Sequence, residues 1–204
     1  MAKLLHTLAD FKSLYEFTGT TSDTKLLLLM GQIYTRISAY LGRGLAKTSR
    51  TERYQGVTKM VPLIGLPIDT EVSPTVQLIS YFSAGEDTYT LSSTEYEIIP
   101  EWGIQLATAL NKDEKLLVTY TGGFPDGTAE GSNVPLDFSG VENGQQIARA
   151  GMIQLIHEWN RRLKPGASEI STDVGTIQME AMTLLDEVRQ TLEPFRHPRF
   201  GWFF

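Results

Sequence analysis

The sequence predicts an α+β protein in which helical segments at both ends of the chain enclose an antiparallel β lobe. Residues 20–42 (TTSDTKLLLLMGQIYTRISAYLG) and 142–163 (ENGQQIARAGMIQLIHEWNRRL) repeat apolar residues at three- and four-residue steps, as amphipathic helices do. From about residue 50, short β-branched or aromatic segments alternate with Gly, Pro or charged turns. We therefore expect a helical bundle, an inserted antiparallel β lobe of five or six strands and an extended C-terminal tail.

The N-terminal part predicts a helical hairpin. Thr7 and Asp10 have the spacing of a capping box, in which each side chain bonds the other residue's amide, and a short helix should follow to about Phe17. Gly42 comes directly after the second helix and is the residue type that ends helices in the left-handed conformation. The apolar stripe of that second helix consists of Leu26, Met30, Ile33, Ile37 and Leu41.

Turn-forming residues divide the middle of the chain into strands. The segments SAGEDT (83–88) and NKDE (111–114) have the composition of hairpin turns. Residues 121–135 (TGGFPDGTAEGSNVP) then form a Gly-rich loop that is long enough to suggest a function of its own.

The C-terminal part returns to helix. The helix at 142–163 should end at KPG (164–166), and residues 166–180 are either a polar linker or a β-hairpin. Thr183 and Asp186 form a second capping box, which opens a helix that stops at Pro194. The predicted domains are a helical domain (1–49 and 142–194), a β lobe with its Gly-rich loop (50–135) and an extended tail (195–204).

The composition excludes several kinds of site. The chain of 204 residues contains no cysteine, which excludes disulfides, thiolate metal sites and thiol nucleophiles. Its three histidines, His6, His157 and His197, are far apart in the sequence, so we predict no metal site and no cofactor. We also predict no membrane segment, because the longest apolar run, LLLLM (26–30), is too short to span a bilayer.

Charge is distributed unevenly. The net charge is −6, which argues against a protein that grips nucleic acid as a whole. Residues 61–130 hold eleven Asp or Glu against two Lys, whereas residues 43–59 and the C-terminal segment are basic. The β lobe is therefore expected to be acidic.

No catalytic motif stands out, and the prediction is that the chain is not an enzyme. HEWNR (157–161) lacks the second histidine of a zincin helix, and GGFPDG (122–127) lacks the lysine of a phosphate-binding loop. Glu95, Glu97 and Glu101 could pair as the carboxylates of a hydrolase, although solvated strand faces explain them more simply. A second alternative is a carbohydrate- or protein-binding module whose ligand site lies on the β lobe, with Tyr89, Tyr96 and Trp102 as stacking residues.

The C-terminal segment EPFRHPRFGWFF (193–204) combines five aromatic residues with two arginines and two prolines. Such a segment suits docking into a partner's groove or onto a sheet edge. Two other interpretations stay open: the tail folds back over its own helices, or its aromatic and arginine side chains stack on single-stranded bases.

Several stretches in this order resemble the head–tail connector (adaptor) proteins of tailed bacteriophages, in the long form that carries a β lobe. The family's pattern is an early helix ending in a YLGR-like signature, a strand of the form TE-Y-G, and a terminal helix with EVR followed by PR. The matching stretches here are LADFKSLYEFTGTTSDTKLLLLMGQIYTRISAYLGRGL, TERYQG, LLVTYTGGFP, IARAGMIQLIHEWNRR and LLDEVRQTLEPFRHPRF. The resemblance covers nearly the whole chain.

The resemblance implies a structural virion protein, made in the cytoplasm of the bacterial host and placed in the neck. Such proteins form a ring, typically of twelve copies, beneath the portal, prolong the DNA channel and contact the next neck or tail protein. Genomic DNA would pass through the lumen without sequence-specific binding. The implied portal-docking residues are Arg196, Pro198, Arg199, Phe200, Trp202, Phe203 and Phe204. The implied ring contacts are Tyr34, Ile37, Tyr40, Leu41, Arg161 and Arg162, and the candidate channel-facing acids are Glu95, Glu97 and Glu101.

Overall fold

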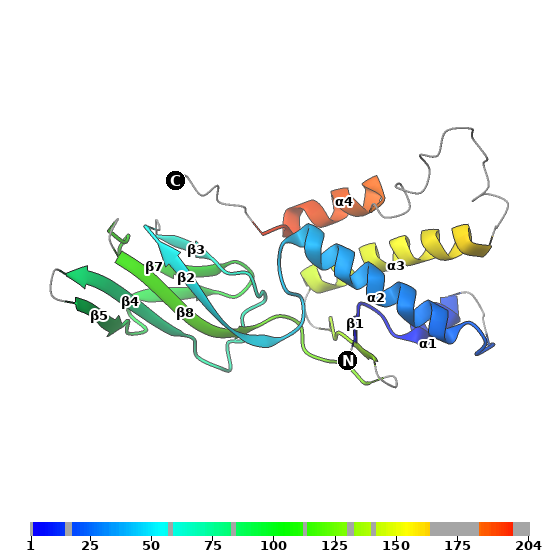
Figure 1. Cartoon of the computed structure of the whole chain (residues 1–204), viewed down its shortest axis with the longest axis horizontal. Coiled ribbons are helices and arrows are strands. Elements are labelled where there is room, and N and C mark those ends of the chain that lie inside the picture. The colour runs from blue at the N-terminus through cyan, green and yellow to red at the C-terminus, as the bar shows by residue number, and fades with distance from the viewer. Residues whose placement is uncertain are drawn as a thin grey trace. The chain divides into compact units, whose positions relative to one another are not determined.

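The computed structural model describes residues 2–14, 18–56, 59–82, 85–111, 114–129, 133–139, 142–163 and 184–197. The chain divides into two compact units, which are described separately (Figure 1). The helical unit comprises Met1–Leu41 and Asp126–Arg196, and the β unit comprises Gly42–Pro125 with the segment that starts at His197. These bounds differ from the predicted ones at three places. Residues 42–49 belong to the β unit, whereas residues 126–135 and residues 195–196, predicted as the start of the tail, belong to the helical unit.

The β unit contains two antiparallel sheets, where the sequence predicted one lobe of five or six strands. The four-stranded sheet has the order β2 (Thr48–Gln55), β8 (Glu114–Gly122), β4 (Thr75–Phe82), β5 (Gly85–Thr90). The three-stranded sheet has the order β3 (Met60–Pro62), β7 (Gly103–Leu106), β6 (Tyr96–Ile99). Figure 1 shows the strands of the larger sheet side by side, with β8 between β2 and β4.

Alternating side chains of the central strands build the core of the β unit. On β8, Leu116, Val118 and Tyr120 are buried, while the residues between them are only partly buried. Val76 of β4 and Ile104 of β7 belong to the same core, so both sheets contribute to it. This alternation is the period-2 signal that predicted strands here.

The two predicted hairpin turns have different outcomes. β4 and β5, on either side of residues 83–84, pair antiparallel, as expected for a hairpin at SAGEDT. NKDE (111–114) is not a hairpin turn, because it leads from β7 in the smaller sheet to β8 in the larger one. The amide of Asn111 donates to Oε2 of Glu114, the first residue of β8, at 2.7 Å.

The helical unit contains α1 (Leu8–Leu14), α2 (Asp23–Leu41), α3 (Glu142–Leu163), α4 (Asp186–Leu192) and the short 3-10 helix η3 (Glu193–Phe195). Helix α3 lies against both α2 and α4. The Phe11 and Trp159 rings meet edge to face, with centroids 5.8 Å apart, which ties α1 to α3. Beside the helices, β1 (Ala2–Leu4) pairs in parallel with β9 (Asn133–Pro135), a contact that the sequence did not predict.

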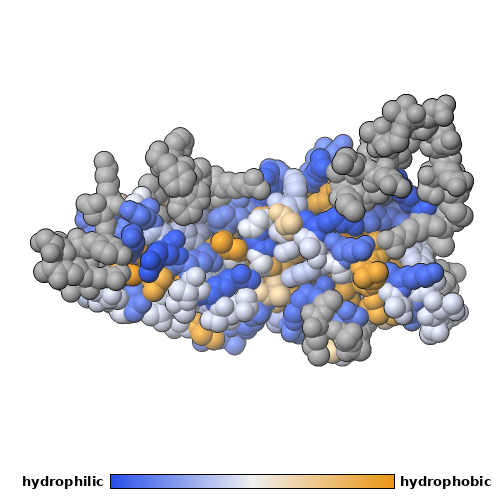
Figure 2. Space-filling model, viewed as in Figure 1, coloured by the Kyte–Doolittle hydropathy of each residue, from blue (hydrophilic) through white to orange (hydrophobic). Residues whose placement is uncertain are grey.

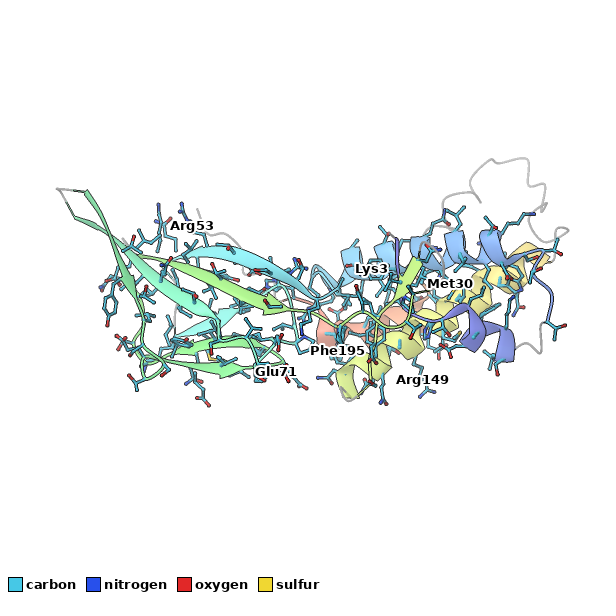
Figure 3. The ribbon with its side chains drawn as sticks, turned by 90° about the horizontal axis from the view of Figure 1, so that it is seen from below. Lys3, Met30, Arg53, Glu71, Arg149 and Phe195 are labelled. Atoms are coloured by element: carbon cyan, nitrogen blue, oxygen red, sulfur yellow. The ribbon has the colours of Figure 1, made fainter. Side chains whose placement is uncertain are left out.

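The apolar stripe of α2 faces the core of the helical unit. Its buried residues are Leu26, Leu29, Met30, Ile33, Ile37 and Leu41. Figure 3 shows Met30 among the helices of this unit, whereas Arg149 projects outward from α3. The apolar period that predicted the helix therefore also defines the face that it buries.

Helix ends were predicted well where the signal is local. The amide of Thr7 donates to Asp10 Oδ2 at 3.1 Å and the amide of Asp10 donates to Thr7 Oγ1 at 2.9 Å, which confirms the first capping box. Gly42 has φ 65° directly after α2, as a left-handed terminator should.

The predicted start of the last helix was wrong. Helix α4 begins at Asp186, with Leu185 as its N-cap and no side-chain cap, and Thr183 lies outside the described residues. The Leu185 amide donates instead to Gln154 Oε1 on α3 at 3.0 Å, so a long-range contact replaces the expected cap. The segment predicted as a linker or hairpin (166–180) also lies outside the described residues.

Hydrophilic residues dominate the surface shown in Figure 2, and hydrophobic residues appear there in separate small areas. Among the residues that the structure describes, no helix has the length and apolar character needed to cross a membrane.

Candidate functional site

Arg196 and Tyr40, predicted for portal docking and ring contacts, meet inside the helical unit. The Tyr40 hydroxyl donates to Glu193 Oε2 at 2.5 Å, and Arg196 forms an ion pair with Glu193 at 2.9 Å. The Arg196 guanidinium also lies 5.0 Å from the centre of the Tyr40 ring. The hydrogen bond between Tyr40 and Glu193 raises the pKa of Tyr40 and lowers the pKa of Glu193. Arg196 is thus held by its own chain.

The other predicted ring contacts differ in exposure. Ile37 and Leu41 are 0% and 1% exposed and pack in the core of the helical unit. That corrects their assignment, because neither side chain offers surface to a neighbouring copy. Tyr34 and Arg161 are half-buried and retain some surface, and the side chain of Arg162 lies outside the described residues. So do the remaining predicted docking residues, Pro198, Arg199, Phe200, Trp202, Phe203 and Phe204.

The three predicted acids of the β lobe have different surroundings. Glu95 Oε2 accepts from the Ser92 amide at 2.8 Å, from Ser92 Oγ at 2.9 Å and from the Tyr89 hydroxyl at 3.2 Å. The Ser92 bonds lower the pKa of Glu95, so this carboxylate is an ionised turn-forming group. Glu97 on β6 and Glu101 in the β6–β7 turn are exposed.

The three aromatic residues that could have stacked on a ligand, Tyr89, Tyr96 and Trp102, differ in how exposed they are. Tyr89 on β5 is 55% exposed. Tyr96 on β6 packs against the core, and its hydroxyl donates to the Pro74 carbonyl at 3.2 Å. Trp102 is half-buried in the turn between β6 and β7. Only Tyr89 therefore presents most of its ring surface.

The structure adds a polar cluster that the sequence did not point out, centred on Glu52 of β2. Both Tyr54 and Tyr120 donate their hydroxyls to the Glu52 carboxylate. The Ile64 amide donates to Oε1 and Oε2, each at 3.3 Å. Tyr120 also accepts a hydrogen bond from the Gly65 amide at 2.7 Å. The cluster therefore holds the segment around residue 64 on the larger sheet.

Burial and hydrogen bonding set the protonation of this cluster. Burial raises the pKa of Tyr54 and of Tyr120, and their bonds to Glu52 add to the rise. Both phenols are therefore neutral donors at any physiological pH. Tyr54 has a second acceptor, the Pro62 carbonyl at 2.7 Å, so its single proton is shared between two oxygens.

Two glycines accommodate Arg50 beside this cluster. A Cβ added at Gly44 would lie 2.0 Å from Arg50 Nη2, and one added at Gly65 would lie 2.6 Å from Arg50 Nε. No larger residue fits at either position while Arg50 stays in place.

His197 also lies in this part of the β unit. Burial lowers the pKa of His197 most, and the nearby charge of Arg43 lowers it further. The hydrogen bond of His197 to the Pro62 carbonyl acts in the opposite direction.

The cluster around Glu52 has a structural role: it fixes the segment around residue 64 to the larger sheet. Each Glu52 oxygen accepts hydrogen bonds from within the β unit, which leaves little capacity for a substrate. Across the described ranges, no group of three or more His, Asp or Glu could hold a metal ion. A sequence signal for the cluster does exist, since Arg50, Glu52 and Tyr54 alternate on one face of a predicted strand.

Comparisons with known proteins concern the fold. No family model matches the chain, and no curated protein matches it. A chain of a solved structure described as "Neck of empty GTA particle computed with C6 symmetry" is 14% identical, with a TM-score of 0.50. That match covers 96% of this chain and 91% of the other, so it spans both units.

Two further structures are similar at lower scores. A chain of "Virion of native gene transfer agent (GTA) particle" is 14% identical, with a TM-score of 0.48, over 96% of this chain and 91% of the other. A chain of "Neck of native GTA particle computed with C12 symmetry" is 15% identical, with a TM-score of 0.45, over 94% of this chain and 88% of the other.

Proposed function

We propose that this chain is a structural protein of the neck of a phage-like particle, an adaptor that forms a ring beneath the portal and extends the DNA channel toward the tail. The observation that carries the proposal is the fold similarity to a chain of a GTA particle neck over 96% of the sequence. The similarity includes the helical unit and the β unit together, which is more specific than either unit alone. The same class of protein is implied by the connector-like stretches of the sequence.

The proposal assigns the C-terminal residues to portal docking and a set of surfaces to ring formation. In a twelve-copy ring, each copy would contribute one tail to the portal, so weak individual attachments add as avidity. Arg196 would set where the docking segment leaves the helical unit, because it is fixed by Glu193 and Tyr40. Tyr34 and Arg161 keep surface for neighbouring copies. The adaptor would carry out no catalysis.

The acidic part of the β unit, residues 61–125 with nine Asp or Glu against two Lys, would line the DNA channel in this proposal. Lys and Arg bind phosphates by displacing counterions, whereas carboxylates repel them and let DNA slide. Glu97 and Glu101 are exposed and suit such a wall, while Glu95 is committed to its turn. A ring in which these two residues point away from the axis would contradict this part of the proposal.

Cryo-electron microscopy of the protein with DNA-filled heads from its source tests the whole proposal. The expected result is a ring below the portal, with C-terminal segments inserted between portal subunits and another neck protein beneath the ring. A protein that adds no density at the portal vertex, at concentrations well above those in an infected cell, would overturn it.

A further inference from the structure

The larger sheet of the β unit has two open edges. In the order β2-β8-β4-β5, the strands β2 and β5 each have a hydrogen-bonded neighbour on one side only, within the described part of the chain. Figure 1 shows them at opposite sides of the sheet. Edge strands present unpaired backbone groups and are templates for another strand.

The direction of the strands makes the two edges complementary. All three pairings in this sheet are antiparallel, so β2 and β5 run in opposite directions. A second copy placed beyond β5 in the same orientation would present its β2 antiparallel to β5. The sheet would continue through both copies with one pairing pattern throughout.

The two faces of the sheet also match across this junction. The strand registers place Thr51, Thr119, Thr75, Gln77, Thr90 and Thr88 on one face. They place Tyr89 on the opposite face, with Leu78 beside it and with Tyr54 at the far edge of the sheet. Tyr89 thus lies on the core-facing side but is 55% exposed, because β5 is the last strand. A neighbouring β2 would cover Tyr89 with a strand that carries Tyr54 on the matching face.

The backbone groups of β5 are arranged for such an addition. The Leu91 amide donates to the Val76 carbonyl at 2.9 Å, so the amides of Tyr89 and Leu91 point toward β4. The alternation then directs the amides of Thr88 and Thr90 to the open edge. On β2, the exposed side chains of Thr51 and Arg53 are polar, and Figure 3 shows Arg53 projecting from the sheet.

We propose that the β5 edge of one copy pairs with the β2 edge of the next, forming a head-to-tail sheet through neighbouring copies. A contact between two different surfaces is heterologous, and repetition closes it into a ring when the rotation permits. The inference rests on the proposed function in that it supplies the ring contact of the β unit.

Engineered disulfides test this pairing directly, because the chain contains no cysteine. The double variants T51C/T88C and T51C/T90C sample two registers that keep the same faces together. On mild oxidation of the full chain, in concentrated solution and on DNA-filled heads, one of them should yield covalent ladders of linked chains. Antiparallel neighbours bring such Cα atoms within the range that a disulfide bridges. The single variants should not form ladders, and neither should A39C/T88C, in which the first cysteine replaces the exposed Ala39 of α2.

A second pair of variants separates the backbone pairing from side-chain effects. T88P in the full chain removes an edge amide without breaking the β4–β5 ladder, and T88A keeps that amide. In the T51C/T90C background, T88P should reduce cross-linking at least about tenfold, while T88A leaves it within about twofold.

The outcomes distinguish this inference from the proposed function. Rings on heads that give no cross-link in either register would overturn the strand pairing and leave the adaptor role intact. Cross-linking in solution without binding to heads would support the pairing and contradict the adaptor role. Absence of both rings and cross-links would overturn both.

Discussion

The Tyr120 hydroxyl shows how one polar atom can fix a loop on a sheet. This hydroxyl accepts a hydrogen bond from the Gly65 amide at 2.7 Å and donates one to Glu52. Tyr120 is only 2% exposed. Y120F would leave that buried amide without its acceptor, which typically costs about 1–3 kcal/mol. We expect the free energy of unfolding to fall by that amount in urea titrations followed by circular dichroism.

Y89F is the matched control for Y120F. It also removes one tyrosine hydroxyl, but from a residue that is 55% exposed. Substitutions at such sites usually change stability by less than about 0.5 kcal/mol. If Y120F were as stable as Y89F, the hydrogen bonds of the Glu52 cluster would not stabilise the fold.

His6 gives stability a dependence on pH. Its Nε2 lies 2.5 Å from the Ala148 carbonyl, and burial lowers its pKa below 6.5, while the bond to Ala148 and the charge of Asp10 oppose the shift only in part. Below about pH 6.5 the unfolded chain therefore binds more protons than the folded chain, so stability falls as pH decreases. H6Q should lose less stability than the natural chain between about pH 7.5 and 5.5.

Urea titrations at both pH values check this expectation. Burial lowers the pKa of His197 as well, so part of the pH dependence should survive in H6Q. An unchanged difference in unfolding free energy between the two pH values would show that His6 is protonated equally in both states.

At the scale of the element, α4 depends on a side chain of α3 for its start. Gln154 is 1% exposed, accepts from the Leu185 amide at 3.0 Å and donates to Glu158 Oε1 at 2.8 Å. Glu158 in turn pairs with Arg36 of α2 at 2.7 Å, so one polar chain joins three helices. Q154L keeps similar volume but leaves the amide unpaired, which should cost about 1–3 kcal/mol.

Q146L is the control for Q154L, since Gln146 lies on an exposed position of the same helix. Thermal unfolding should show a lower Tm for Q154L alone. Equal Tm values for the two variants would mean that solvent replaces Gln154 at the start of α4.

Elements whose signals are local could be predicted from the sequence, and those that depend on distant contacts could not. The Thr7–Asp10 capping box and the Gly42 terminator need only neighbouring residues, and both are present. The β1–β9 pair joins segments more than 100 residues apart, and no local period encodes it. The division of the strands into two sheets has the same cause, because strand spacing does not specify partners.

The site predictions follow the same rule. Ile37 and Leu41 belong to the stripe that predicted α2, and that stripe is what the unit buries, so they cannot also be surface contacts. Arg50, Glu52 and Tyr54 alternate visibly in the sequence, but their meaning depends on Tyr120 from another strand and on glycines at positions 44 and 65.

At the scale of the whole molecule, the last described residues, Arg196 and His197, contact the rest of the protein. Arg196 pairs with Glu193 and lies over Tyr40, and His197 forms a hydrogen bond with the Pro62 carbonyl. A chain that ends after Pro194 loses these contacts, whereas one that ends after His197 keeps them. We therefore expect the chain that ends after His197 to have the Tm of the full chain. The chain that ends after Pro194 should have a Tm lower by several degrees, about 2–4 °C for each kcal/mol lost.

The truncation after His197 separates docking from folding. If residues 198–204 are the portal anchors, this variant stays folded but no longer sediments with DNA-filled heads, because the ring loses one attachment for every copy. The full chain, which keeps the tail, serves as the binding control in the same sedimentation. A Tm far below that of the full chain would show that the tail packs on its own molecule. Undiminished binding to heads would show that the adaptor attaches through another surface.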